Sequence, residues 1–135
     1  MRAKAPRPMS DTREALKRMR VQTPELGEEL GHFLIGKSTE ATGGGLRWTF
    51  DPLHKTWSPR PFQADLFGEL LQAISVPTLV VAGERGYRLE DEGARIAKIE
   101  DHRVVEIPGV GHMIHWFEPD ALAKALNAFF AENAA

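Results

Sequence analysis

The sequence contains no cysteine. This absence excludes disulfide bonds, thiolate metal sites and a cysteine nucleophile within the chain. The sequence also has no apolar run near the roughly 20 residues that a membrane-spanning helix needs. Its first twenty residues are basic, but they lack the continuous apolar stretch of a signal peptide. We therefore predict a cytoplasmic protein without a membrane partner, and a transit peptide is the less favoured alternative.

A strong excess of charge of either sign is absent as well. The 135 residues include 17 Lys and Arg against 19 Asp and Glu, which gives a net charge of −2. This balance disfavours a nucleic-acid-binding protein. With 42% hydrophobic and 27% charged residues, the composition is that of a folded globular chain. The length allows one domain with a modest core, or a piece of a larger domain.

The first half of the chain predicts two helices and an extended segment. Asp11 and Glu14 have the spacing of a capping box, which predicts a helix that runs to about Arg20. Thr23 followed by a proline predicts a second helix start, and apolar residues recur at helical spacing up to about Ile35. After three glycines, a short strand or extended arm is predicted from the alternating residues Leu46, Trp48 and Phe50.

The second half predicts one β-α-β unit between two further helices. An apolar stripe predicts a helix over residues 62–74. Residues 76–82 are apolar on both faces and rich in β-branched side chains, which predicts a strand buried between helices in a parallel sheet. A crossover helix over 90–99 and a strand over 103–107 complete the unit. The closing helix starts at Glu118, and its inward-facing residues are predicted as Leu122, Ala125, Leu126, Phe129 and Phe130.

Two parallel strands are too few for a stable sheet. A strand that is apolar on both faces needs cover on both of them, and its unpaired backbone groups need neighbouring strands. The sheet is therefore expected to be completed from outside these residues. Two partners are open: a missing N-terminal segment, or a second copy of the chain that pairs strand to strand and makes a homo-oligomer.

Two motifs have a structural interpretation that we favour over a functional one. The pattern G-x-x-x-x-G-K-S spans residues 31–38, but it follows helical spacing and carries bulky residues where a phosphate-binding backbone must curl. We predict a helix that ends at Gly36 and Lys37 rather than a nucleotide site. His112 and His115 have a spacing that a metal site can use in a helix, but no third ligand supports them. No metal and no cofactor are therefore predicted.

An ordered series of motifs follows residue 74. A strand that ends in Gly83 and Glu84 is followed by a helix, by a second strand and by the loop Pro-Gly-Val-Gly-His at residues 108–112, before the final amphipathic helix. This series resembles the last two strands and the last helix of α/β-hydrolases, whose catalytic histidine follows the last strand in a loop of the form P-G-x-G-H. The resemblance implies that His112 is this histidine.

The stretches at residues 43–52 and 58–62 look similar, more loosely, to the cap of hydrolases with a helical lid. The resemblance as a whole implies an α/β fold class, namely a partial α/β-hydrolase fold with a short parallel β-α-β sheet flanked by helices. It divides the chain into a mostly helical cap-like segment, residues 1–73, and a core segment, residues 74–135.

The physical case for His112 does not depend on the family. A loop that leaves the C-terminal end of a parallel strand is where open α/β sheets bind ligands. An imidazole held there can accept the proton of a serine hydroxyl, or of a water that attacks an enzyme-bound ester, and return it to the leaving group. The alternative is a loop histidine that only satisfies backbone groups.

The resemblance also exposes what the chain lacks around His112. The nucleophile elbow of the family, G-x-S-x-G or its aspartate or cysteine form, occurs nowhere in the sequence. Many relatives carry the acid of the triad at the position that is Gly86 in this chain. Glu84, Glu90 and Asp91 are nearby carboxylates, whereas other relatives place the acid after an earlier strand. We favour the second alternative.

A substrate pocket is predicted around Trp57 and Met113. Large aromatic side chains that can line a pocket for a small hydrophobic substrate are Trp48, Phe50, Trp57, Phe62 and Phe67. Ordinary core packing is the alternative role of these side chains.

The leading hypothesis is the C-terminal half of an α/β-fold hydrolase that acts on an ester or a related bond. In this hypothesis His112 is the general base and the nucleophile lies outside the chain, so the chain alone is not expected to be active. The rival hypothesis is a non-catalytic half-fold that serves as a binding or oligomerisation module and closes its strand edge with a second copy.

Overall fold

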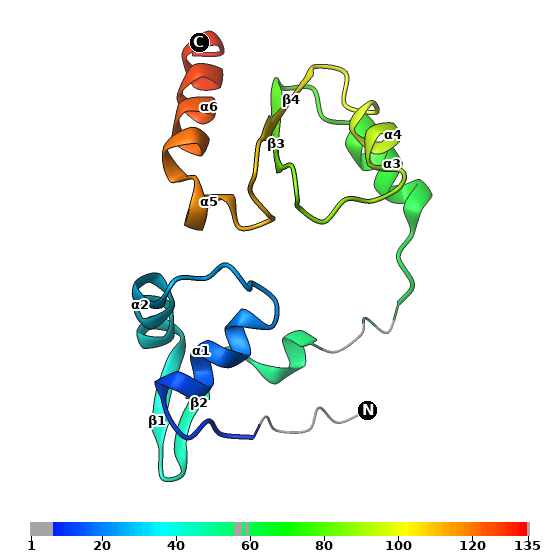
Figure 1. Cartoon of the computed structure of the whole chain (residues 1–135). Helices are drawn as coiled ribbons and strands as arrows, with labels where there is room; N and C mark the ends of the chain where they lie inside the picture. The colour runs from blue at the N-terminus through cyan, green and yellow to red at the C-terminus, as the bar shows by residue number, and fades with distance from the viewer. Residues whose placement is uncertain (1–6, 56–57, 59, 135) are drawn as a thin grey trace. The chain divides into compact units, whose positions relative to one another are not determined.

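The computed structural model describes residues 7–55, 58 and 60–134. The chain forms two compact units, which meet at the junction of Arg60 and Pro61 and can be followed by colour in Figure 1. We call them the first and the second unit. The helix over residues 64–72 belongs to the second unit. The units therefore divide earlier in the chain than the predicted cap-like and core segments do.

The first unit combines two helices with a β-hairpin. Its elements are α1 (Thr12–Arg20), α2 (Glu28–Ser38), β1 (Thr39–Thr42), β2 (Gly45–Trp48) and the 3-10 helix η1 (Pro52–Lys55). β1 and β2 pair antiparallel, with Thr39 opposite Trp48, and form the hairpin in Figure 1.

The start of α1 confirms the predicted capping box. Asp11 Oδ1 accepts a hydrogen bond from the N–H of Glu14 at 2.8 Å. Glu14 Oε2 in turn accepts one from the N–H of Ser10 at 2.8 Å. The first bond satisfies a backbone donor that the first turn of a helix otherwise leaves unpaired, and the second ties the residue before the N-cap, rather than the N-cap itself, to this turn. The buried face of α1 consists of Ala15 and Leu16.

The predicted start of the second helix at Thr23 is wrong, because α2 begins at Glu28. The preceding segment makes a turn instead, in which the N–H of Leu26 donates to the C=O of Thr23 at 3.1 Å. The side chain of Leu26 is only 1% exposed, and its C=O accepts a hydrogen bond from Arg20 Nε at 2.8 Å. Burial of the Leu26 side chain thus outweighs the helix start that Thr23 and the following proline predict.

The residues of the phosphate-loop pattern, 31–38, lie within α2. The prediction of a helix rather than a nucleotide-binding loop is therefore confirmed at this position. Gly31 serves packing, because a Cβ atom there would lie 2.3 Å from Leu16 Cδ1.

The hairpin also pairs with the residues that precede α1. The predicted extended segment is β2, but its partner β1 was not predicted. Met9 and Leu46 exchange two backbone hydrogen bonds of 2.7 Å each. Gly45, with φ +124°, permits this approach, since a Cβ atom there would lie 2.0 Å from Met9 O. The core of this unit contains Met9, Ala15, Leu16, Leu26 and Ile35.

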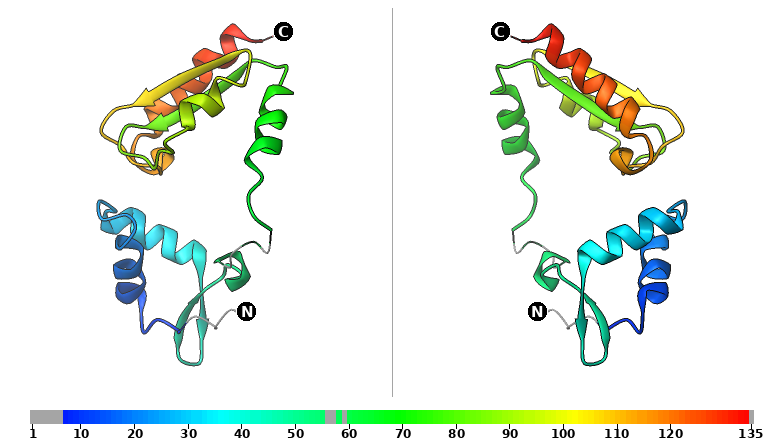
Figure 2. Two further views of the ribbon diagram at one scale, coloured as in Figure 1. Left: turned by 90° about the vertical axis from the view of Figure 1, so that its right-hand side faces the viewer. Right: turned by 90° about the vertical axis from the view of Figure 1, so that its left-hand side faces the viewer.

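The second unit is built on a parallel strand pair. Its elements are α3 (Ala64–Gln72), β3 (Thr78–Gly83), α4 (Glu92–Ile96), β4 (His102–Ile107), α5 (Ile114–Phe117) and α6 (Pro119–Glu132). β3 and β4 are parallel, from Thr78 opposite His102 to Gly83 opposite Ile107. The predicted β-α-β unit is thus present. α6 contacts both strands and α4 contacts α3, and α6 runs alongside the strand pair in both views of Figure 2.

Two local predictions in the second unit need correction, and one helix was not predicted. The crossover helix spans only Glu92–Ile96 rather than residues 90–99, because the chain turns to bury Ile99. The short helix α5 was not predicted. Phe130 does not face inward, since 62% of its surface is exposed.

Apolar surface stays open in the second unit. The strand predicted to be buried on both faces is only half-buried in this chain before Gly83. Exposed apolar side chains continue along the chain before it at Phe62, Leu66, Leu70 and Val76. Within this chain the strand therefore lacks the cover that its sequence predicts for both faces, because a pair of strands with one contacting helix cannot supply it.

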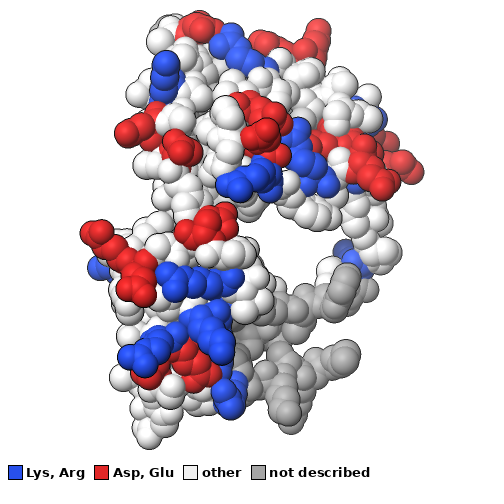
Figure 3. All heavy atoms as spheres, in the orientation of Figure 1, with Lys and Arg blue, Asp and Glu red and all other residues white. Residues whose placement is uncertain are grey.

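Charged side chains of both signs lie next to one another over the face drawn in Figure 3. Ion pairs join Arg18 to Glu14 at 2.6 Å, Arg47 to Glu40 at 2.6 Å and Arg95 to Asp91 at 2.8 Å. Such surface pairs typically contribute at most about 1 kcal/mol each. Among the helices in the described ranges, none is long and apolar enough to cross a membrane.

We predict that Glu14 makes the stability of the first unit depend on pH. The N–H of Ser10, followed by the guanidinium of Arg18, lowers the pKa of Glu14 from 4.5 to about 2. Because this pKa is lower in the folded chain, the stabilisation is present above pH 4.5 and is lost as the pH falls toward 2. Glu14→Gln should therefore melt at a lower temperature at neutral pH, and the difference should shrink toward pH 2.

Thermal unfolding followed by circular dichroism across this range measures the effect. Glu25→Gln, at an exposed position outside the helices, is the matched control and should leave the pH profile unchanged. Identical profiles for the two variants would contradict the prediction.

Candidate active site

His112 lies in the loop between β4 and α5, and its side chain is exposed. Its neighbours two residues away on either side are buried: Val110 is 2% exposed and Ile114 is 7% exposed. Together with Ile107 they form a core cluster, against which Val81, Val105, Phe117, Ala121 and Leu122 pack. The backbone is therefore anchored on both sides of an imidazole that faces solvent.

Backbone hydrogen bonds tie this loop to the end of β3. The N–H of Glu84 donates to the C=O of Ile107 at 3.0 Å, and the N–H of Arg85 donates to the C=O of Val110 at 2.9 Å. These bonds continue the pairing of the two strands beyond their last residues. The loop that carries His112 is thus an extension of the sheet.

Glycine is required at two places in this arrangement. A Cβ atom on Gly83 would lie 2.2 Å from the C=O oxygen of Gly111 and 2.6 Å from that of Val110, so β3 ends in direct contact with the loop. Gly109 has φ +69°, a left-handed conformation that other residues rarely adopt. Gly109 of the loop motif thus permits the turn that leads from β4 to His112.

The expected position of the triad acid adjoins the histidine but offers no carboxylate. A Cβ atom on Gly86 would lie 3.7 Å from the backbone nitrogen of His112. Glu84 Oε2 accepts a hydrogen bond from the N–H of Gly109 at 2.6 Å, and Asp91 pairs with Arg95. In the part of the chain that the structure describes, no hydrogen bond or ion pair joins His112 to a carboxylate.

The two histidines of the metal hypothesis do not gather further ligands. The ring of His115 contacts Trp116, with centroids 5.6 Å apart. Among the residues described, no group of three or more His, Asp and Glu side chains could hold a metal ion.

The predicted pocket residues are only partly placed. Trp57 lies outside the described residues. Met113 is half-exposed and precedes α5, where its C=O accepts a hydrogen bond from the N–H of Trp116 at 2.9 Å. The pocket around these two residues therefore stays a prediction.

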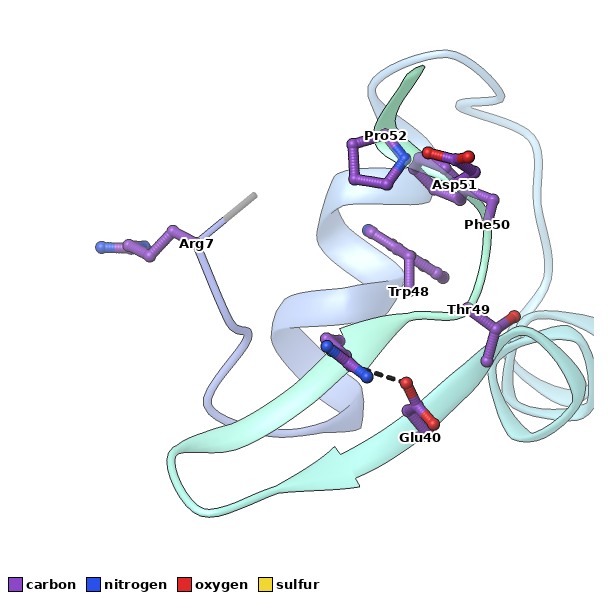
Figure 4. Close-up of a pocket in the computed structure, with 8 residues that line it drawn as sticks. Arg7, Glu40, Trp48, Thr49, Phe50, Asp51 and Pro52 are labelled. Carbon is purple, nitrogen blue, oxygen red and sulfur yellow. Dashed lines mark hydrogen bonds and ion pairs between the residues drawn. The ribbon is translucent and has the colours of Figure 1, made fainter. Parts of the chain in front are cut away.

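Two of the five aromatic residues line a hollow in the first unit (Figure 4). The rings of Trp48 and Phe50 stack with centroids 6.4 Å apart. The hollow measures about 300 Å³ and is also lined by Arg7, Glu40, Arg47, Thr49, Asp51 and Pro52. In the second unit, Phe62 and Phe67 contact each other at 5.3 Å.

No protein-family model matches the chain, and no curated protein matches its sequence. Solved structures do match. The thioesterase domain from the curacin biosynthetic pathway superimposes with a TM-score of 0.77 at 28% identity, over 93% of this chain and 45% of that one.

Two further structures agree with this match. A hypothetical protein of Pseudomonas aeruginosa PAO1 has a TM-score of 0.75 at 23% identity, over 93% of this chain and 46% of its own. E-2-(acetamidomethylene)succinate hydrolase has a TM-score of 0.72 at 17% identity, over 93% and 47%. This chain has a partial α/β-hydrolase fold.

The predicted fold class is thereby confirmed. The partial α/β-hydrolase fold spans less than half the length of each of these structures, which fits the C-terminal portion predicted from the order of the motifs. At 17% and 23% identity, the last two likenesses concern the fold alone.

Two residues that contact the loop were not recognised as such from the sequence. Glu84 was considered only as a triad acid, and Arg85 was not considered. The available signal was a pair of opposite charges directly after the glycine that ends a predicted strand. Their partner Gly109 is 25 residues away from Glu84 in the sequence, so no local pattern links them.

We predict that the contact at Gly83 decides whether the loop can form in this partial α/β-hydrolase fold. Gly83→Ala places a methyl group against two backbone oxygens, and should destabilise the second unit by about 1–3 kcal/mol. Gly93→Ala is the matched control, because nothing lies within 4 Å of a Cβ atom there and alanine favours the helix by up to about 1 kcal/mol. Denaturant unfolding of both variants measures the difference. A Gly83 variant as stable as the Gly93 variant would contradict the contact.

Proposed function

We propose that this chain is the C-terminal part of an α/β-fold hydrolase that cleaves an ester or a related bond, with His112 as general base. One observation carries the proposal: His112 is exposed on a loop that continues a parallel strand pair and is anchored by buried residues on both sides. Solved structures that include a thioesterase domain and a hydrolase share the fold.

The arrangement suits proton transfer. An imidazole at this edge of the sheet can take the proton from a nucleophile hydroxyl as it attacks the substrate, and can then donate it to the leaving group. The nucleophile and the oxyanion-stabilising donors would come from a segment outside this chain. No cofactor is needed for these steps.

A small hydrophobic substrate is part of the proposal. The hollow beside Trp48 and Phe50 in the first unit offers stacked aromatic surface, and charged residues also line it. Its volume of about 300 Å³ equals the lower end of the range for small-molecule sites.

A hybrid enzyme tests the role of His112. We would join the segment of the curacin-pathway thioesterase domain that precedes the matched region to this chain, and follow hydrolysis of a p-nitrophenyl ester. His112→Ala should lower kcat at least about a hundredfold, as expected when a general base is removed.

His115→Ala is the matched control for the hybrid. His115 is also exposed and lies three residues away, so its removal should leave kcat close to that of the unsubstituted hybrid. Turnover that survives in the His112 variant, with melting behaviour unchanged in both variants, would refute the assignment of the base.

The second candidate function is a non-catalytic binding module whose sheet is closed by a second copy. One observation favours it. The second unit, which contains the parallel strand pair, exposes the apolar side chains of Phe62, Leu66, Leu70 and Val76.

Size in solution separates the two candidates, and we predict that the hydrolase part does not form a discrete dimer. Light scattering of the purified chain over a dilution series should show a monomer or concentration-dependent association, because its apolar surface fits a different partner. A folded homodimer of constant mass, together with an inactive hybrid, would favour the module instead.

A further inference from the structure

The two residues after β3 bind the His112 loop with their side chains as well as their backbones. Glu84 Oε2 accepts a hydrogen bond from the N–H of Gly109 at 2.6 Å. The guanidinium of Arg85 donates to the C=O of the same residue. A carboxylate and a guanidinium from adjacent positions thus hold both polar backbone groups of one glycine. Hydrogen bonds with one charged partner are stronger than neutral ones.

These two hydrogen bonds to Gly109 act at the turn that leads to His112. The left-handed conformation of Gly109 turns the chain out of β4 toward His112. Within the described residues, its N–H and C=O are bound by these two side chains and by no backbone group. Without them, this side of His112 would keep burial of Val110 and the backbone bonds of Glu84 N–H to Ile107 C=O and of Arg85 N–H to Val110 C=O, but nothing would bind Gly109 itself.

We propose that Glu84 and Arg85 are positioning residues for His112. The inference rests on the proposed role of His112 as general base. The two side chains, together with burial of Val110, fix the loop on the N-terminal side of the histidine, and burial of Ile114 fixes it on the C-terminal side. The imidazole is then presented in one place to a nucleophile on the complementary segment, and small misplacements of such a group cost much of the rate.

Arg88, three residues after Arg85, offers a matched control. Arg88 pairs with Glu92 and, at 3.1 Å, with Glu106 Oε2 on β4. It has the same charge as Arg85 and also ties the segment after β3 to β4. Because neither of its partners lies in the loop of residues 108–112, Arg88→Ala should leave His112 unaffected.

The first measurement uses the unsubstituted chain. Nuclear magnetic resonance on isotope-labelled protein should detect a scalar coupling across the hydrogen bond between the Gly109 amide nitrogen and Glu84 Cδ. This experiment does not depend on whether any variant folds. If the coupling is absent while couplings between β3 and β4 are observed, the proposal is overturned.

The second measurement follows the Cε1–Hε1 resonance and the ring motion of His112 in variants. Glu84→Ala and Arg85→Ala should move the resonance and raise the ring mobility, with Gly109 amide exchange about tenfold faster in Glu84→Ala. Glu84→Gln and Arg85→Lys keep an acceptor and a donor, so they should restore both signals. His102, whose Nδ1 lies 2.6 Å from Ile99 O, is the internal reference and should not change.

A different outcome would overturn the positioning role. An unchanged His112 signal in both alanine variants would do so, as would a change shared by His102 and the strand amides, which would indicate general loosening. Neither readout requires turnover. If the hybrid enzyme stays active without His112, the assignment of His112 as general base is refuted, but the magnetic resonance results are unaffected. Failure of the proposed function can therefore be told apart from failure of the positioning role.

Discussion

The hydrogen-bonded pairing of β3 with β4 is the interaction on which the second unit depends. It runs in register along all six residues of each strand and then continues through the N–H groups of Glu84 and Arg85 into the following loop. Because Gly83 has no side chain, that loop lies directly against the end of β3. The position of His112 therefore depends on strand pairing, which brings Glu84 and Arg85 beside the loop that carries it.

The same pairing leaves the sheet incomplete. A strand with one hydrogen-bonded neighbour keeps an open edge, and the exposed side chains of Leu70 and Val76 lie in the same unit. The solved structures with this fold are about twice as long. Uncovered apolar surface and a sequence without a nucleophile elbow thus have one explanation, which is that the chain carries only part of the fold.

Sequence reasoning reached the parts of the fold that local patterns determine. The capping box of Asp11, the apolar strand before Gly83 and the glycine-rich loop before His112 each occupy a few consecutive residues, and each has the predicted form. It failed where distant contacts decide. β1 forms because β2 is available to pair with it, and burial of Leu26 delays the start of α2. For the candidate site, the loop could be predicted but its side-chain partners could not.

The side-chain partners also bear on the acid that would orient His112. Glu84 is the candidate that directly follows β3, but its carboxylate is bound to the N–H of Gly109. To reach the imidazole it would have to break a charge-assisted hydrogen bond, at a cost of about 1.5–3 kcal/mol, and would release the loop that carries the base. One side chain cannot both align the loop and orient the ring. With glycine at position 86 and Asp91 paired to Arg95, an acid from an earlier strand outside this chain stays the favoured prediction over Glu90.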